Sequence, residues 1–171
     1  MPDEPQASAV KILVASDVHG RLRSLRWIFE NEKNVDALFF LGDGLSDLDR
    51  ALELLGDARP KYPVYRVRGN CDVGAPDPVE GLAPVGGVLF FYTHGHYYGV
   101  KSGYDALAEA AQARGADVAL FGHTHCQTLK YQGIAEYPTL FNPGSVLSGA
   151  SYGVITVANG KCRFGWKKVP Q

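Results

Sequence analysis

Short runs of apolar residues, separated by amphipathic and polar segments, constrain the fold of this chain more than any other feature. The runs are continuous rather than alternating, which is typical of strands that are buried on both faces of a sheet. Amphipathic segments of helical period lie between some of them, at residues 21–32, 46–55 and 104–114. This order predicts an α/β fold with largely parallel strands in its first half. The runs cover residues 10–15, 37–41, 64–67, 88–92 and 118–121.

After Gly122 the pattern changes to strand-like pieces joined by glycine, asparagine and proline, at residues 127–131, 139–141, 152–157 and 161–167. Asn159-Gly160, between the last two pieces, is a strong signal for a two-residue hairpin. A second, more antiparallel sheet is therefore expected. The predicted architecture is a four-layer αββα sandwich, in which two face-to-face mixed sheets are flanked by helices. It forms a single domain over residues 10–171, preceded by a disordered lead-in over 1–9.

Charge and cysteine content exclude several classes of protein. The net charge of −1 is dispersed, so no basic stripe is available for strong binding to a nucleic-acid backbone. The apolar runs fall far short of the roughly 18 residues that a membrane span requires. Cys71, Cys126 and Cys162 never form a Cys-x-x-Cys pair, which argues against a disulfide framework and against a thiolate zinc site. We therefore expect a soluble, cytoplasmic protein in which Cys126 and Cys162 are small packing residues.

Clusters of polar residues follow the predicted strands. In open α/β sheets, ligands bind in the crevice outside the carboxyl ends of the strands, so these clusters are expected to converge on one site. All five histidines of the chain lie in them. Within pairs spaced by two, such as 17 and 19, both side chains point to one side if strand geometry persists. The clusters are Ser16-Asp17-Val18-His19, Gly42-Asp43, Gly69-Asn70-Cys71-Asp72, Thr93-His94-Gly95-His96, Gly122-His123-Thr124-His125 and Asn142-Pro143-Gly144-Ser145.

The donor atoms of these clusters restrict the metal chemistry. Imidazoles mixed with carboxylates and an amide, without thiolates, suit borderline divalent ions such as manganese, iron, zinc, cobalt or nickel. Taken singly, Asp17 and Asp43 could be helix caps and His19 a surface histidine, but the joint pattern favours ligands. The set is too large for one tetrahedral ion and suits two ions about 3.5–4 Å apart, bridged by a carboxylate. The candidates are Asp17, His19, Asp43, His123 and His125, together with Asn70 and His94, which are included mainly on the family resemblance described next.

In order along the chain, the motifs Asp-x-His, Gly-Asp, Gly-Asn-x-Asp, His-Gly-His and Gly-His-Thr-His resemble those of the calcineurin-like metallophosphoesterases. Gly-Asn-Cys-Asp at 69–72, Asn-Pro-Gly-Ser at 142–145 and Ser-Tyr-Gly at 151–153 are similar to the small bacterial and archaeal phosphodiesterase branch. The resemblance spans residues 11 to about 157. It implies one ion held by Asp17, His19 and His125, a second held by Asn70, His94 and His123, and Asp43 as the bridge.

The resemblance also implies a hydroxide between two divalent ions, manganese above all, with nickel, iron, cobalt, zinc or magnesium as alternatives. Asn70 would also contact the phosphate, and His96 would lie behind the ligands or touch the phosphate. Cys71 departs from the wider superfamily, where a histidine at this place, oriented by the next acidic residue, often protonates the leaving group. A thiol suits that task less well at neutral pH, so we predict modest activity and a gain from Cys71→His with poorer leaving groups.

A charge count favours a small phosphodiester as the substrate. Two divalent ions supply four positive charges, and Asp17, Asp43 and one hydroxide remove three, so a singly charged diester leaves the site neutral. The main alternative is a metal-binding protein-interaction scaffold of the same fold, as in the small retromer subunit that the family includes. A zinc peptidase or deaminase is weaker, because the sequence has neither His-Glu-x-x-His nor Pro-Cys-x-x-Cys. The apolar C-terminal strands could form the face of a homodimer.

Overall fold

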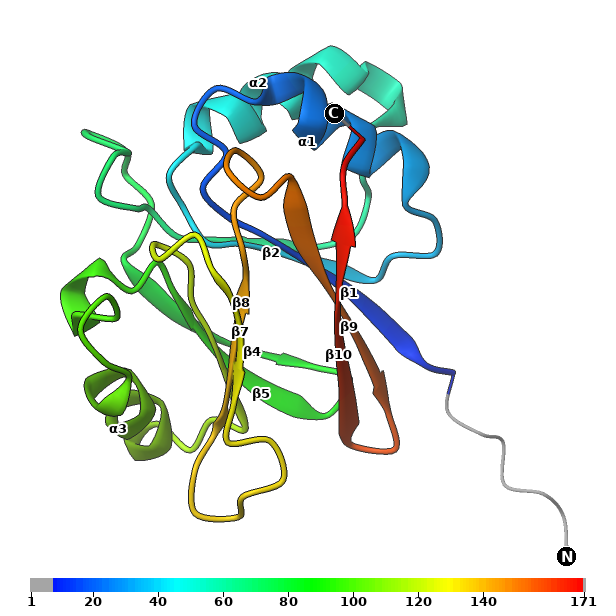
Figure 1. Ribbon diagram of the computed structural model, residues 1–171. Helices are drawn as coiled ribbons and strands as arrows, with labels where there is room; N and C mark the ends of the chain where they lie inside the picture. Colours follow the sequence, from blue (N-terminus) through cyan, green and yellow to red (C-terminus); the bar gives the residue numbers. More distant parts are fainter. Residues whose placement is uncertain (1–7, 171) are drawn as a thin grey trace, which may run out of the picture.

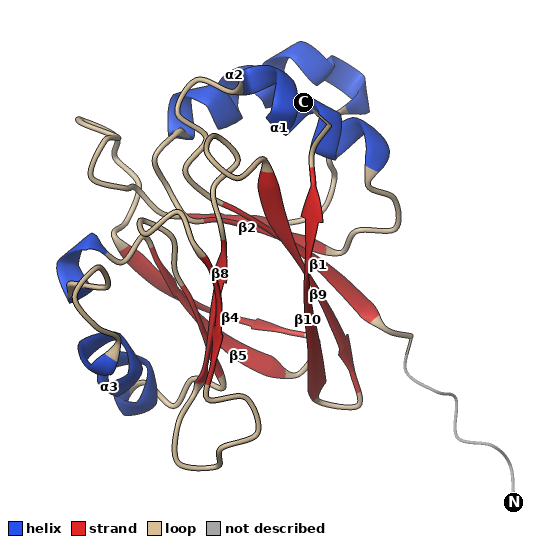
Figure 2. Ribbon diagram, viewed as in Figure 1, coloured by secondary structure: helices blue, strands red, loops and turns tan. Residues whose placement is uncertain are grey.

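The structure is a computed structural model that describes residues 8–170, so most of the expected lead-in lies outside the described residues. Two five-stranded sheets pack face to face (Figure 1), and helices lie over their outer faces (Figure 2). Helices α1 and α2 cover one sheet, and α3 covers the other. The predicted αββα sandwich is confirmed.

The first sheet has the strand order β10-β9-β1-β2-β3. Its parallel part consists of β1 (Val10–Ala15), β2 (Ala37–Phe40) and β3 (Val64–Arg66). The antiparallel hairpin of β9 (Ser151–Ala158) and β10 (Lys161–Lys168) completes it. The covering helices are α1 (Leu22–Asn31) and α2 (Leu45–Leu55), and a short 3-10 helix, η1 (Gly56–Ala58), follows α2.

The second sheet has the strand order β4-β5-β6-β8-β7. Its parallel part consists of β5 (Val88–Thr93), β6 (Val118–Leu120) and β8 (Thr139–Pro143). The edge strands β4 (Glu80–Val85) and β7 (Gln127–Lys130) run antiparallel to their neighbours. In the sequence, β5 and β6 are connected by a 3-10 helix, η2 (His96–Tyr98), and by α3 (Asp105–Ala113).

The placement of the last two strands corrects the expectation that the C-terminal strands build the second sheet. The predicted hairpin at Asn159-Gly160 is present, with both residues at positive φ (51° and 70°), but β9 pairs with β1 in the first sheet. Alternation of apolar residues identifies a strand and its buried face, but not the sheet that it joins. The apolar side chains of β10, such as Phe164 and Trp166, pack against the core between the sheets.

Strand β4 lies in a segment for which no strand was predicted. It contains Gly81 and Pro84, residue types that are rare inside strands. Pro84 is tolerated because β4 is an edge strand, where one row of backbone groups needs no partner. Gly81 is required because a Cβ there would lie 2.4 Å from the Tyr92 ring on β5. The two residues that hide this strand in the sequence are thus accommodated by its position.

The core lies mainly between the two sheets, where Phe39, Phe90 and Phe141 are fully buried. Further apolar clusters join each sheet to its helices, which explains why the parallel strands are apolar on both faces. In each sheet the parallel strands end at one edge, and the loops that leave β1, β2, β3, β5, β6 and β8 meet there. Among residues 8–170, no helix is long and apolar enough to span a membrane.

Candidate metal centre

The loops at the strand ends bring the predicted ligands together. One group joins the Asp17 carboxylate to the imidazoles of His19 and His125, and a second joins Asp43 to His94 and His123. Within each group, the donor atoms all lie within 4.8 Å of one another. The amide oxygen of Asn70 lies 3.1 Å from Nε2 of His94. All seven candidates therefore lie in one centre, although they are far apart in the sequence.

Left-handed turns, rather than continued strands, direct these side chains. The backbone φ angle is positive at five of the seven candidates, so the condition of continued strand geometry, under which residues spaced by two point to one side, is not met. Non-glycine residues rarely adopt this conformation, and it is concentrated at functional sites. The values are 56° at Asp17, 42° at His19, 56° at Asp43, 68° at His123 and 60° at His125.

Glycines let the loops approach each other closely. A Cβ at Gly42, where φ is +94°, would lie 2.4 Å from the backbone nitrogen of Gly69. A Cβ at Gly69 would in turn lie 2.0 Å from Oδ1 of Asp43. Both distances are far below any contact that a real Cβ makes, so only glycine fits at either position.

The two oxygens of the buried Asp17 carboxylate have different surroundings. Oδ2 accepts hydrogen bonds from the Ser16 hydroxyl (2.7 Å) and the His123 backbone N–H (3.0 Å). Oδ1 is buried and has no hydrogen-bond partner, although Nε2 of His125 lies 3.2 Å away and Nε2 of His19 lies 3.7 Å away. A buried carboxylate oxygen without a partner is costly, and a cation between it and these nitrogens removes that cost. The donors therefore fit a metal ion.

His94 is held in the orientation of a ligand. Its Nδ1 donates a hydrogen bond to the Leu41 carbonyl oxygen (2.7 Å), which directs Nε2 at Oδ2 of Asp43, 3.3 Å away. Fixing one ring nitrogen on a carbonyl is the usual way in which proteins orient a metal-binding histidine. Burial lowers the pKa of His94, but the hydrogen bond to Asp43 and the charges of Asp17 and Asp43 raise it further than burial lowers it. The imidazole thus lies in a field that favours positive charge.

Asp43 and His123 are in the protonation states that a cation requires. Burial raises the pKa of Asp43, but hydrogen bonds from His94 and from the Cys71 backbone lower it well below its ordinary value. Burial and the positive charges of His94 and Lys101 lower the pKa of His123 to about 4. Near neutral pH the carboxylate is therefore ionised and the His123 ring is neutral, as ligands must be.

Two serines, Ser145 and Ser148, support the centre. Nδ1 of His125 lies 2.8 Å from the Ser148 hydroxyl, which also donates to the Ser145 hydroxyl (3.3 Å). The Ser145 hydroxyl in turn donates to the backbone oxygen of Asp17 (2.9 Å). Ser145 lies in the last of the clusters that were expected to converge, and it contacts the centre through the backbone of Asp17. Nothing in the sequence singles out Ser148.

Asp72 links the ligand loops to one another through hydrogen bonds from four backbone N–H groups. Its Oδ2 accepts hydrogen bonds from the N–H groups of Asp43 (2.7 Å) and Gly69 (2.8 Å). Its Oδ1 accepts from Gly44 and Leu45 (2.9 Å each), at the start of α2. A carboxylate at this place also interacts favourably with the helix dipole. Asp72 is therefore fully engaged by backbone amides.

The remaining candidates lie around the ligand groups. His96 belongs to neither group, but its ring centroid lies 5.3 Å from that of His94, and its buried Nδ1 has no partner. The backbone N–H of Cys71 donates to Oδ1 of Asp43 (2.8 Å), and its side chain is exposed. Cys126 is also exposed, so its assignment as a packing residue was wrong. Cys162 is half-buried and packs against the core between the sheets, as predicted.

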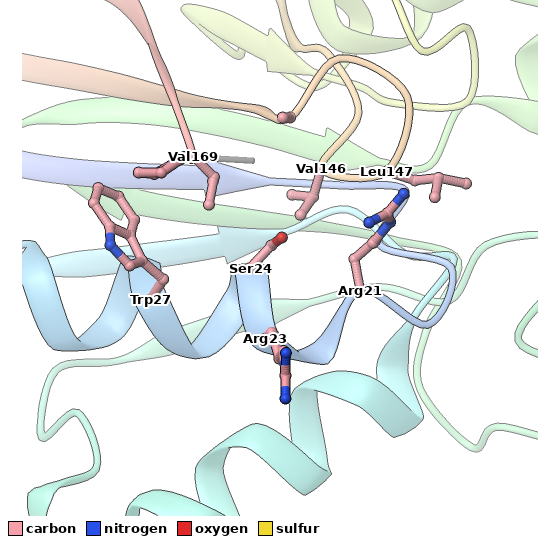
Figure 3. Close-up of a pocket in the computed structure, with 9 residues that line it drawn as sticks. Arg21, Arg23, Ser24, Trp27, Val146, Leu147 and Val169 are labelled. Atoms are coloured by element: carbon pink, nitrogen blue, oxygen red, sulfur yellow. The ribbon is translucent and has the colours of Figure 1, made fainter.

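A cavity of about 330 Å³ lies beside the centre, between α1 and the segment 146–150 (Figure 3). Arg21 and Leu147 lie at one end of it and Trp27 and Val169 at the other. None of the candidate ligands lines it. Its lining reaches the centre through the backbone, because the N–H of Leu147 donates to the carbonyl oxygen of Asp17 (3.1 Å).

An αββα sandwich whose strand ends gather carboxylates and imidazoles into adjoining ligand groups defines a metallophosphoesterase. The chain belongs to the calcineurin-like phosphoesterase superfamily, whose domain model matches residues 10–162. It is 31% identical over 156 residues to the probable metallophosphoesterase YsnB of Bacillus subtilis, covering 88% of this chain and 86% of that protein. It is also 31% identical over 170 residues to the phosphodiesterase YfcE of Escherichia coli, covering 85% and 87%.

Solved structures show the same fold. A predicted phosphoesterase from Streptococcus pneumoniae superposes with a TM-score of 0.73 at 23% identity, covering 96% of this chain and 94% of that one. Vps29 of Entamoeba histolytica in complex with Zn²⁺ superposes with a TM-score of 0.63 at 16% identity, covering 92% and 98%. These likenesses support the fold alone. The function follows from the residues of the site.

Proposed function

We propose that this protein is a phosphodiesterase that hydrolyses a small phosphate diester with two divalent cations, manganese being favoured. The observation that carries the proposal is the unpartnered, buried Oδ1 of Asp17, which faces several imidazole nitrogens and needs a cation. One cation would be held by Asp17, His19 and His125, the other by Asn70, His94 and His123, with Asp43 between them. Such cations lower the pKa of a water nucleophile and polarise the phosphoryl oxygens.

Contacts around the ligands support this proposed arrangement. Ser148 fixes the ring of His125, and the Leu41 carbonyl fixes the ring of His94, so that both Nε2 atoms are directed inwards. Asn70 is exposed, and its amide nitrogen, which makes only a long hydrogen bond of 3.5 Å to Sγ of Cys71, would contact a phosphate oxygen. His96 lies close enough to His94 and His123 to contact the same phosphate without being a ligand.

The charge of the centre supports a diester over a monoester. Asp17 and Asp43 are the only carboxylates in the candidate ligand groups of residues 8–170. With two divalent cations and a hydroxide nucleophile, one excess positive charge remains, which a singly charged diester neutralises. A doubly charged monoester would leave an uncompensated negative charge in a partly buried site, which is unfavourable.

Retention of the whole ligand set favours catalysis over the alternative role as a protein-interaction scaffold. A protein that only binds partners does not need a complete set of ligands, whereas here all seven candidates are present and lie in one centre. The exposed thiols of Cys71 and Cys126 favour a reducing compartment, in keeping with a cytoplasmic location.

The proposal is tested by hydrolysis of a chromogenic phosphodiester with metal-stripped protein that has been reconstituted with different divalent ions. Manganese should restore turnover in the wild type but not in Asp43→Ala, and the diester should be hydrolysed faster than the matching monoester. Equal inactivity of both proteins with every ion would refute the enzymatic function, and faster hydrolysis of the monoester would refute the diester preference.

A further inference from the structure

The thiol of Cys71 completes a third group of possible ligands inside the centre. Three donor atoms all lie within 4.8 Å of one another: Sγ of Cys71, a ring nitrogen of His19 and a carboxylate oxygen of Asp43. His19 and Asp43 also belong to the two groups already described, so the thiol adjoins positions that are assigned to cations. Cys71 is thus placed as a possible ligand, as well as at the position of a proton donor.

The surroundings of the thiol hold it towards the centre. The backbone N–H of Cys71 is fixed on Asp43, and the Asn70 amide donates to Sγ at 3.5 Å. Asp43 is 3% exposed, so the group has a buried carboxylate at its base, whereas Cys71 itself is accessible to ions from solvent. By contrast, Cys126 follows the ligand His125 directly and belongs to none of the candidate groups.

We propose that Cys71 makes the centre selective among cations. Its sulfur binds a thiophilic ion that is also held by His19 and Asp43, whereas manganese is bound by the oxygen and nitrogen donors alone. This inference rests on the proposed metal centre. Thiolate is a soft ligand that prefers zinc-like ions, whereas manganese prefers carboxylate, carbonyl and water oxygens. When a thiophilic ion arrives, the sulfur–metal bond forms and the thiol proton passes to solvent. A sulfur that is bound to this ion can no longer donate a proton to the leaving group.

Cadmium is the probe, because it is thiophilic, redox-inert and gives an ultraviolet sulfur-to-metal charge-transfer band. Metal-stripped wild type, Cys71→Ser and Cys126→Ser are titrated with Cd²⁺, and bound ion and absorbance are measured. The wild type and Cys126→Ser should show the band, and Cys71→Ser should not. Cd²⁺ should bind to Cys71→Ser at least about 10-fold more weakly, because even the loss of an outer partner of a ligand costs that much.

Manganese titration of the same proteins controls for damage to the centre. Mn²⁺ affinity should differ by less than about threefold between the wild type and Cys71→Ser, since sulfur contributes little to binding of that ion. A band that persists in Cys71→Ser, or stoichiometric Cd²⁺ binding to the wild type without a band, would overturn the proposed role of Cys71 but not the proposed metal centre. Failure of the wild type to bind either ion would overturn the metal centre itself.

Discussion

At the scale of single residues, the position of Cys71 bears on how the leaving group receives its proton. The resemblance implied that the acidic residue at 72 would orient a proton donor at 71. Instead, both oxygens of Asp72 accept hydrogen bonds from backbone amides of the ligand loops and of α2. Burial and the charges of Asp43 and other carboxylates raise the pKa of the Cys71 thiol, which makes it a weaker acid.

Cys71→His should therefore raise turnover of diesters with poor leaving groups, but only by about 10-fold, below the full effect of a well-oriented general acid. Substrates whose leaving groups need no proton should show no gain. Steady-state kinetics over a series of leaving groups measures this dependence. If the gain is the same for every leaving group, or absent for all, then the acid is another residue, such as His96.

The close contact between the loops at Gly42 and Gly69 leads to a second prediction about single residues. Gly42 and Gly74 both have positive φ (94° and 79°), but a Cβ at Gly42 would clash with Gly69, whereas nothing lies within 4 Å of one at Gly74. Gly74→Ala should cost about 1 kcal/mol, from the backbone conformation alone. Gly42→Ala adds overpacking and should cost about 2–4 kcal/mol. Equal losses in urea unfolding would show that the approach of the two loops is not as tight as described.

At the scale of elements, Glu32 connects the end of α1 to the first sheet. Its side chain is 5% exposed and pairs with Lys11 on β1 (2.6 Å) and Lys167 on β10 (2.7 Å), and the Tyr152 hydroxyl on β9 donates to it (2.6 Å). Burial raises the pKa of Glu32, but the hydrogen bonds from Lys11, Lys167 and Tyr152 outweigh burial and lower the pKa to about 2. The carboxylate is therefore more easily ionised in the folded protein than in the unfolded chain.

The sign of the pH dependence follows from that difference. Because the folded pKa lies below the ordinary value of 4.5, the stabilisation is complete above that value and is lost as the pH falls from about 4.5 to about 2. Glu32→Gln should lower the free energy of unfolding by about 2 kcal/mol at pH 7, and the difference should shrink through that window. Glu30→Gln removes an exposed pair with Arg26 and should change stability by less than about 0.5 kcal/mol. A Glu32→Gln deficit that is independent of pH would contradict this account.

At the scale of the whole molecule, the sequence predicts the layers better than the connections between them. Apolar runs such as 37–41 are buried on both faces, and this alone requires a layer on each side of the sheet. The pattern does not say which sheet β9 and β10 join, because their partner β1 lies about 140 residues away and any open edge would satisfy the same alternation. Strand β4 was missed because Gly81 and Pro84 oppose a strand unless it lies at an edge.

For the site, too, the sequence predicts the general arrangement better than the local detail. Convergence of Asp17, Asp43 and the histidines is predictable, since parallel strands direct their carboxyl ends to one edge. The positive φ angles that aim these side chains are not, because nothing in a residue such as His123 signals a left-handed turn. Ser148 is equally hidden, since its contact with His125 depends on how the segment after β8 folds back over the centre.

The central claim is that two cations act together in one centre. The most direct test measures turnover of a chromogenic diester by metal-stripped protein as Mn²⁺ is added in known equivalents, with bound metal determined on the same samples. The ligands form two adjoining groups, because Nε2 of His19 in one lies 3.6 Å from Oδ2 of Asp43 in the other. Activity should therefore stay low through the first equivalent, rise steeply through the second and then level off. Full activity at one equivalent, or turnover that does not depend on added metal, would contradict the account.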